Sequence, residues 1–91
     1  MKEYILDLTK IKSIYLLEKE IKKTFDFPAY YGENLDALWD CTKDYVESPS
    51  KIIIIGKDKV PKDMRKYVKD MIDVLMDASK LDYKDITINL K

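Results

Sequence analysis

Four acidic residues are spaced so that a single helix would carry them along one stripe. Asp36, Asp40 and Asp44 are four residues apart, and Glu47 follows three residues later. Side chains at these spacings are neighbours on a helix surface, and like charges there destabilise the helix by about 0.2–0.5 kcal/mol per pair. Aspartate is also a poor residue for a helix interior. Because no fold requires such a stripe, it indicates a surface that binds a positively charged partner.

Other roles for the carboxylates are weighed against this one. A solvated acidic surface with no partner remains open. Carboxylates four residues apart could bind a divalent cation weakly, but such sites usually include oxygens from turns and backbone carbonyls. Acid–base catalysis needs an enclosed site, and a row on one exposed helix encloses no cleft. We therefore predict no catalytic residues, no metal site and no cofactor.

The amino-acid composition supports the non-enzymatic interpretation. The chain contains no histidine, which removes the commonest general base and the commonest zinc ligand. The single cysteine, Cys41, lacks the histidine that would activate a catalytic thiol, and we expect it to be a small packing residue. With only two glycines, a phosphate-binding glycine loop is also excluded.

Aromatic residues surround the predicted stripe. Tyr30, Tyr31 and Trp39 lie beside it. Helical geometry places Trp39 on the rim of the buried arc and Tyr45 within that arc. Large aromatic side chains next to charges are typical anchors of protein interfaces. The alternative is that Trp39 and Tyr45 are simply core residues.

Charge is balanced over the chain but unevenly distributed. The protein has 17 basic and 17 acidic residues, yet residues 26–49 contain six acids and one lysine, a net charge of −5. Nucleic acid would be an unsuitable partner for this segment, because phosphate binding needs clustered Lys and Arg. A basic protein surface fits it better.

The length of 91 residues predicts one domain, and the longest apolar run, residues 52–55, is too short to cross a membrane. The N-terminus has an acid before any signal-peptide core, so we expect a cytoplasmic protein. Hydrophobic periodicity predicts strands over 4–8, 51–55 and 85–90 and helices over 14–25, 35–46 and from Pro61 onward. Ser13 and Asn34 are the expected N-caps, and residues 57–60 are ambiguous, with a turn of helix as one reading.

Strands separated by helices predict an α/β fold with parallel crossovers. The isoleucines of 52–55 favour a central position for the second strand. The expected architecture is a small two-layer sandwich of three parallel strands packed by three to four helices. Isoleucines on both faces of that strand would require cover on both sides, and residues 57–60 are a candidate for part of it.

The run from Pro28 to Cys41, PAYYGENLDALWDC, closely resembles the signature of the barstar family. The resemblance extends weakly over the whole chain and implies the same three-stranded parallel fold. Members of this family are intracellular inhibitors of barnase-like ribonucleases. Their second helix and preceding loop plug the ribonuclease active site, where acidic side chains stand in for substrate phosphates.

The resemblance assigns roles by position. Asp40 matches the family's principal phosphate-mimicking acid, Asp36 a second acid facing basic residues of the enzyme, and Tyr30 an aromatic that packs on the active-site rim. Together with the neighbouring positions, the predicted partner-binding residues are Tyr30, Gly32, Asn34, Leu35, Asp36, Trp39, Asp40, Asp44, Tyr45 and Glu47.

This sequence departs from the family pattern at Lys43, Asp44 and Tyr45, and the match is poor beyond Ile55. The departures bear on which ribonuclease is the partner. We expect a 1:1 complex with a basic, barnase-like ribonuclease of the extracellular type and a monomer when free. The alternative is an adaptor or regulatory domain that uses the same scaffold to bind another protein.

Overall fold

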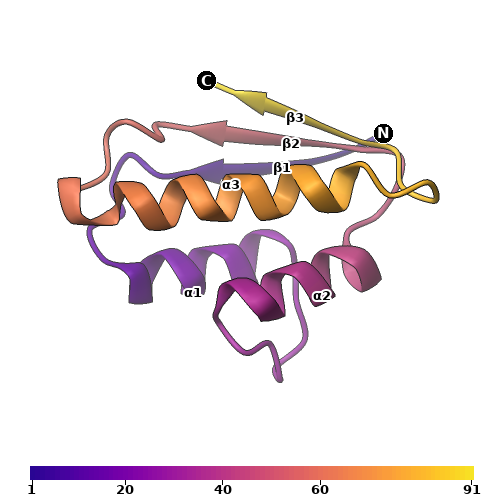
Figure 1. The fold of residues 1–91 in the computed structure, drawn as a ribbon, viewed down its shortest axis with the longest axis horizontal. Helices are drawn as coiled ribbons and strands as arrows, with labels where there is room; N and C mark the ends of the chain where they lie inside the picture. Colours follow the sequence, from indigo (N-terminus) through magenta and orange to yellow (C-terminus); the bar gives the residue numbers. More distant parts are fainter.

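The computed structural model describes residues 1–91 and contains one sheet covered by helices on one side (Figure 1). Strands β1 (Lys2–Asp7), β2 (Ser50–Ile55) and β3 (Ile86–Leu90) are parallel, and β2 lies in the centre. Helices α1 (Ile14–Thr24), α2 (Leu35–Tyr45) and α3 (Arg65–Ser79) form the second layer. The predicted α/β class, the three parallel strands and the central position of the second strand are confirmed.

The two faces of the sheet differ in burial. Leu6, Ile52 and Ile54 point into the helical layer and are fully buried. On the opposite face, Ile5 pairs in register with Ile53, and Ile5 is 55% exposed while Ile53 is half-buried. The expected second cover is therefore missing, and flanking strands alone shield the outer isoleucines of β2.

The start of the third helix differs from the prediction. Pro61 has extended backbone (ψ 148°) and precedes a 3₁₀ turn, Lys62–Met64, so that α3 begins only at Arg65. Met64 in this turn is almost fully buried. Pro61 cannot be the first residue of a helix, because its backbone is extended. The 3₁₀ turn that follows it directs Met64 into the core.

Residues 57–60 form a turn rather than a turn of helix. Gly56 follows β2 and has φ +77°, and the Lys59 N–H donates to the Gly56 carbonyl oxygen (2.9 Å). A Cβ at Gly56 would lie 2.7 Å from Thr9 Cγ2, closer than carbon atoms can approach. Glycine is therefore required here by both its backbone angle and the space available.

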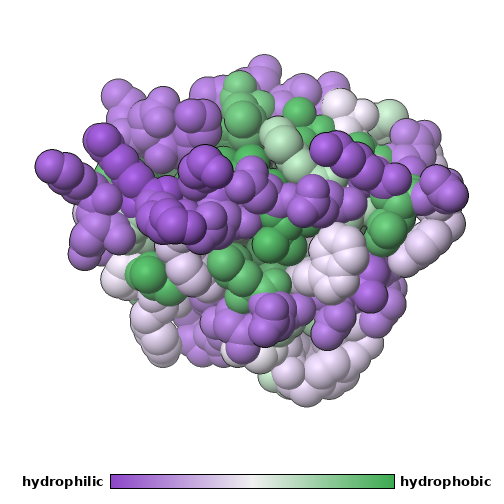
Figure 2. All heavy atoms as spheres, in the orientation of Figure 1, coloured by the Kyte–Doolittle hydropathy of each residue, from purple (hydrophilic) through white to green (hydrophobic).

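The α1 helix begins as the sequence indicates, with the Ser13 hydroxyl accepting from the Leu16 N–H (3.1 Å). Figure 2 shows hydrophilic side chains in a band across the face of the molecule that α3 occupies, with hydrophobic patches on either side of the band. None of the helices is long and apolar enough to cross a membrane.

Candidate functional site

The α2 helix begins where the sequence predicts. Asn34 has extended backbone, and its side-chain oxygen accepts from the Ala37 N–H (2.8 Å). The helix ends at Tyr45, and Val46 follows with its side chain in the core. Leu38 and Thr42 are fully buried on the inner face of α2, so the opposite face is directed to solvent.

That outward face carries Asp36, Asp40 and Asp44, which together with Glu47 are defined here as the acidic stripe, and all four are exposed. The prediction that Glu47 lies on the same helix is wrong, because α2 ends at Tyr45 and Val46 has extended backbone (ψ 121°), so Glu47 lies just beyond the helix end. Two cations lie near it. Lys43 Nζ is 3.8 Å from Asp40 Oδ1 and 5.4 Å from the centre of the Trp39 ring, and Lys84 Nζ donates to the carbonyl oxygen of Val46 (2.8 Å), the residue before Glu47. The Asp40 side chain is 71% exposed, so this ion pair is weak and solvent-screened. The stripe is therefore a predominantly negative surface that runs along α2 and just beyond its C-terminal end.

The aromatic residues are arranged differently from the prediction. Tyr30 is 71% exposed and Tyr45 is 42% exposed, and their hydroxyl groups are in contact. The expectation that Tyr45 lies in the buried arc is wrong, because Val46 takes the core position at this end of α2 and Tyr45 turns toward Tyr30. Trp39 is half-buried on the rim, as expected.

Two other predicted residues lie where the loop meets α2. Gly32 is exposed, and a Cβ there would be 3.2 Å from the Ala37 Cβ, so the loop passes close to the start of the helix. Leu35 is partly buried and packs against the core. Of the ten predicted residues, the structure thus exposes Tyr30, Gly32, Asn34, Asp36, Asp40, Asp44, Tyr45 and Glu47, and leaves Leu35 and Trp39 partly covered.

Tyr31 is not beside the stripe but buried, at 4% exposure. Its hydroxyl donates to Glu18 Oε1 (2.6 Å), and the Tyr67 hydroxyl donates to the other oxygen of the same carboxylate. Glu18 is itself only 2% exposed. Burial, reinforced by the hydrogen bonds to Glu18, raises the pKa of both tyrosines, so both hydroxyls remain donors.

Sequence reasoning did not find this buried cluster, although a signal was present. Glu18 follows Ile14 by four residues and precedes Ile21 by three, so it lies within the apolar stripe of α1. An acid within an apolar stripe is buried only when it has hydrogen-bond partners. Those partners, Tyr31 and Tyr67, come from distant parts of the chain, and the sequence gives no indication of the pairing.

Cys41, on α2, is buried and belongs to the hydrophobic core, which confirms its predicted packing role. Burial raises the pKa of its thiol, and the nearby charges of Asp44 and Asp40 act in the same direction. The thiol therefore stays protonated and unreactive near neutral pH. No group of three or more His, Cys, Asp or Glu side chains is placed to hold a metal ion.

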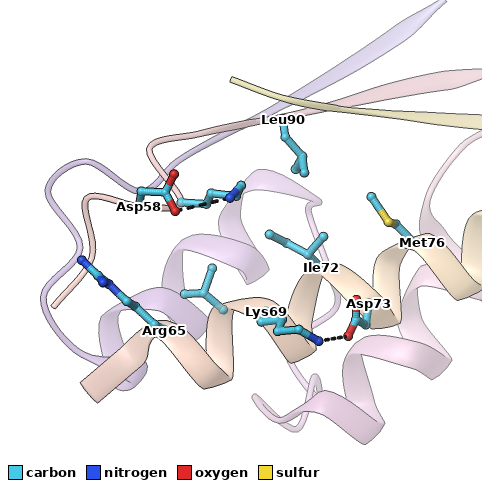
Figure 3. Close-up of a pocket in the computed structure, with 9 residues that line it drawn as sticks. Asp58, Arg65, Lys69, Ile72, Asp73, Met76 and Leu90 are labelled. Carbon is cyan, nitrogen blue, oxygen red and sulfur yellow. Dashed lines mark hydrogen bonds and ion pairs between the residues drawn. The ribbon is translucent and has the colours of Figure 1, made fainter. Parts of the chain in front are cut away.

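A groove of about 390 Å³ lies elsewhere, between α3 and the end of β3 (Figure 3). Val68, Ile72, Met76 and Leu90 form its apolar part, and charged side chains including Arg65 and the Lys69–Asp73 ion pair lie around it. None of the ten predicted residues lines it. The groove and the acidic stripe are separate features.

Comparison with known proteins identifies the family of this chain. The family model described as Barstar (barnase inhibitor) matches residues 1–91, the whole chain. The chain belongs to the barstar family. It is also 32% identical over 80 residues to a Bacillus subtilis (strain 168) protein named "Putative ribonuclease inhibitor YrdF", a match that covers 88% of each chain.

Membership of the barstar family confirms the resemblance seen in the run from Pro28 to Cys41. The family is one of barnase inhibitors, so an inhibitory role with a ribonuclease as partner is supported at the level of the family.

Proposed function

We propose that this protein inhibits a barnase-like ribonuclease by covering its active site with the acidic stripe and the loop of residues 26–34. The observation that carries the proposal is the exposure of Asp36, Asp40 and Asp44 on one face of α2, with only a weak ion pair between Asp40 and Lys43. Glu47 is exposed just beyond the end of this helix. A ribonuclease active site is positively charged because it must bind phosphate. Carboxylates on a preformed helix satisfy the same donors and offer no bond to cleave.

Asp40 is the central carboxylate in this proposal, with Asp36 and Asp44 one turn away on either side. Tyr30 and Tyr45, in contact through their hydroxyls, supply exposed aromatic surface next to the acids. Aromatic anchors beside charged pairs are typical of residues that dominate binding energy. Gly32, Asn34, Leu35, Trp39 and Glu47 complete the proposed interface.

The proposed complex is 1:1, the inhibitor acts in the cytoplasm, and it has no catalytic activity and no metal requirement. The negative stripe attracts a basic enzyme over a distance, which raises the association rate at low salt. Rapid association suits an inhibitor that must neutralise a ribonuclease inside the cell that produces it.

The test is titration of a barnase-like ribonuclease with the purified protein. We expect inhibition that is complete at one equivalent, an association rate that falls as salt screens the stripe, and no change on addition of EDTA. An association rate that is independent of salt, or inhibition that is lost in EDTA and restored by a divalent ion, would contradict the proposal. Failure to bind any ribonuclease, with capture of another basic protein through the same stripe, would favour the adaptor alternative.

A further inference from the structure

The loop between α1 and α2 is attached to α1 at every second residue. Lys22 Nζ donates to the Ala29 carbonyl oxygen (3.4 Å), Glu18 accepts from the Tyr31 hydroxyl (2.6 Å), and Lys19 Nζ pairs with Glu33 (3.0 Å). Lys22 follows Lys19 by three residues and Glu18 by four, so the three side chains lie on one side of α1. They form what we term the α1 clamp: Glu18, Lys19 and Lys22.

The residues that alternate with the clamped positions are all exposed, whereas among the clamped ones Tyr31 is buried, Glu33 is partly buried and Ala29 is exposed. Tyr30, Gly32 and Asn34 alternate with Ala29, Tyr31 and Glu33, and all three are exposed and belong to the proposed interface. The hydrogen bonds and the ion pair between the clamp and the loop go to none of the ten proposed interface residues. It acts instead on their neighbours in the chain, so it determines where the interface residues point.

The loop has backbone conformations that need external support. Asp26 and Glu33 have φ of +53° and +56°, a left-handed region that is unfavourable for residues other than glycine. Such conformations persist when surrounding contacts over-determine them. For Glu33 that contact is the ion pair with Lys19, and the Asn34 side chain donates to the Gly32 carbonyl oxygen (3.3 Å) beside it.

The Glu18 contact is the central one. Its carboxylate is almost fully buried and receives one hydroxyl from the loop, Tyr31, and one from α3, Tyr67. The Tyr31 ring also packs against Phe27, with ring centres 4.9 Å apart. A buried charge that loses a partner is costly, so the pairing favours the single loop conformation in which Tyr31 reaches Glu18.

We propose that Glu18 and Lys19 are positioning residues, which hold the loop of residues 26–34 in its binding conformation before the partner arrives. This inference rests on the proposed function, since it concerns how the same interface is presented. A loop ordered in advance avoids the loss of freedom that a flexible loop would suffer on binding. If only a tenth of the free molecules had the competent loop, the apparent dissociation constant would rise about tenfold.

Two matched variants test the proposal. Tyr31→Phe and Tyr67→Phe each remove one hydroxyl from the same carboxylate and keep the aromatic ring. Only Tyr31 belongs to the loop, so Tyr31→Phe should weaken inhibition about tenfold, whereas Tyr67→Phe should change it by less than about twofold. Urea unfolding measures the folding stability of both variants. If the role of the hydroxyls is purely structural, the loss of affinity should follow the loss of stability in both variants.

A charge exchange gives an independent check on Lys19. Lys19→Glu should weaken inhibition even though it makes the surface more negative, because it sets two acids against each other at Glu33. The double variant Lys19→Glu/Glu33→Lys restores the pair and should recover most of the affinity. Absence of this rescue would remove Lys19 from the clamp.

Amide hydrogen exchange of the free protein separates this inference from the proposed function. The Tyr31 N–H donates to the Pro28 carbonyl oxygen (3.0 Å) and reports on loop order without any ribonuclease. We expect the corresponding amide to exchange faster in Tyr31→Phe and at the wild-type rate in Tyr67→Phe. If the wild-type protein inhibits no ribonuclease, the proposed function fails while exchange still tests the clamp. Equal effects of the two Phe variants on inhibition and exchange would overturn the positioning role.

Discussion

Helices α2 and α3 pack against each other and both bury one apolar face. The charged residues on their exposed faces are arranged differently. On α3, Lys66 pairs with Asp70 (2.7 Å) and Lys69 pairs with Asp73 (3.2 Å), each four residues apart. On α2 the residues at the same spacing are all aspartates. The α3 pattern is that of a solvated helix that stabilises itself.

The comparison shows what an ordinary surface helix in this protein looks like. It has acids too, and two of them, Asp70 and Asp73, each pair with a lysine four residues earlier. On α2, Asp36 and Asp44 have no such ion pair, and Asp40 has only the weak contact with Lys43 (3.8 Å). The solvated-surface alternative leaves this difference between the two helices unexplained. Four predictions test the contrast, from the largest expected effect to the smallest.

The largest effect is expected on binding. Asp40→Ala should weaken the ribonuclease complex by about 2–5 kcal/mol, because it leaves buried cations of the partner without a counter-charge. Asp73→Ala, the matched change on α3, should leave inhibition unchanged. An inhibition titration measures both, and equal affinities for Asp40→Ala and wild type would show that the stripe is an ordinary solvated surface.

The second prediction converts α2 into a helix like α3. Asp40→Lys would place a lysine between Asp36 and Asp44, replacing two repulsive pairs with two attractive ones. At about 0.2–0.5 kcal/mol per pair, the free energy of unfolding should rise by about 1 kcal/mol. The weak, exposed contact with Lys43 (3.8 Å) becomes a like-charge pair three residues apart, which offsets part of this gain. Urea unfolding provides the measurement, and a fall in stability would contradict the view that the stripe is held at a cost to the fold.

The third prediction makes α3 less regular. Lys69→Ala removes the ion pair with Asp73 and should lower the free energy of unfolding by about 0.2–0.5 kcal/mol. Inhibition should not change, because the pair lies beside the groove between α3 and β3 and away from the stripe. A loss of inhibition in this variant would extend the interface to α3.

The smallest effect is a change in thiol reactivity, measured without a partner. Asp44 and Asp40 help to raise the pKa of Cys41, although burial is the larger cause. Asp40→Asn removes one of these charges, so the pKa should fall, the thiolate fraction should rise and alkylation at pH 8 should become modestly faster. Asp73→Asn is the control and should leave the rate at the wild-type value.

The sequence was sufficient for features that depend on local pattern. The Asn34 cap, the position of α2 and the row of Asp36, Asp40 and Asp44 on it follow from spacing, whereas Glu47 lies beyond the helix end. The isoleucines of 52–55 identified the central strand. The failures depend on contacts between distant segments. Burial of Tyr31 requires Glu18 and Tyr67, and the exposure of Tyr45 requires Tyr30. The helix start at Arg65 depends on the extended backbone of Pro61, which fixed φ alone does not determine.

The order of the strands in the chain has a consequence for how the inhibitor folds. Every proposed interface residue lies between β1 and β2, whose parallel pairing joins Lys2 to Ser50 and Asp7 to Ile55. Parallel pairing between distant segments is slow compared with local helix formation, and an isolated helix of 11 residues is marginal in water. We therefore expect the acidic surface to form only after β2 has been synthesised and has paired with β1. A peptide cut from this region would keep the charges of the inhibitor and lose its shape.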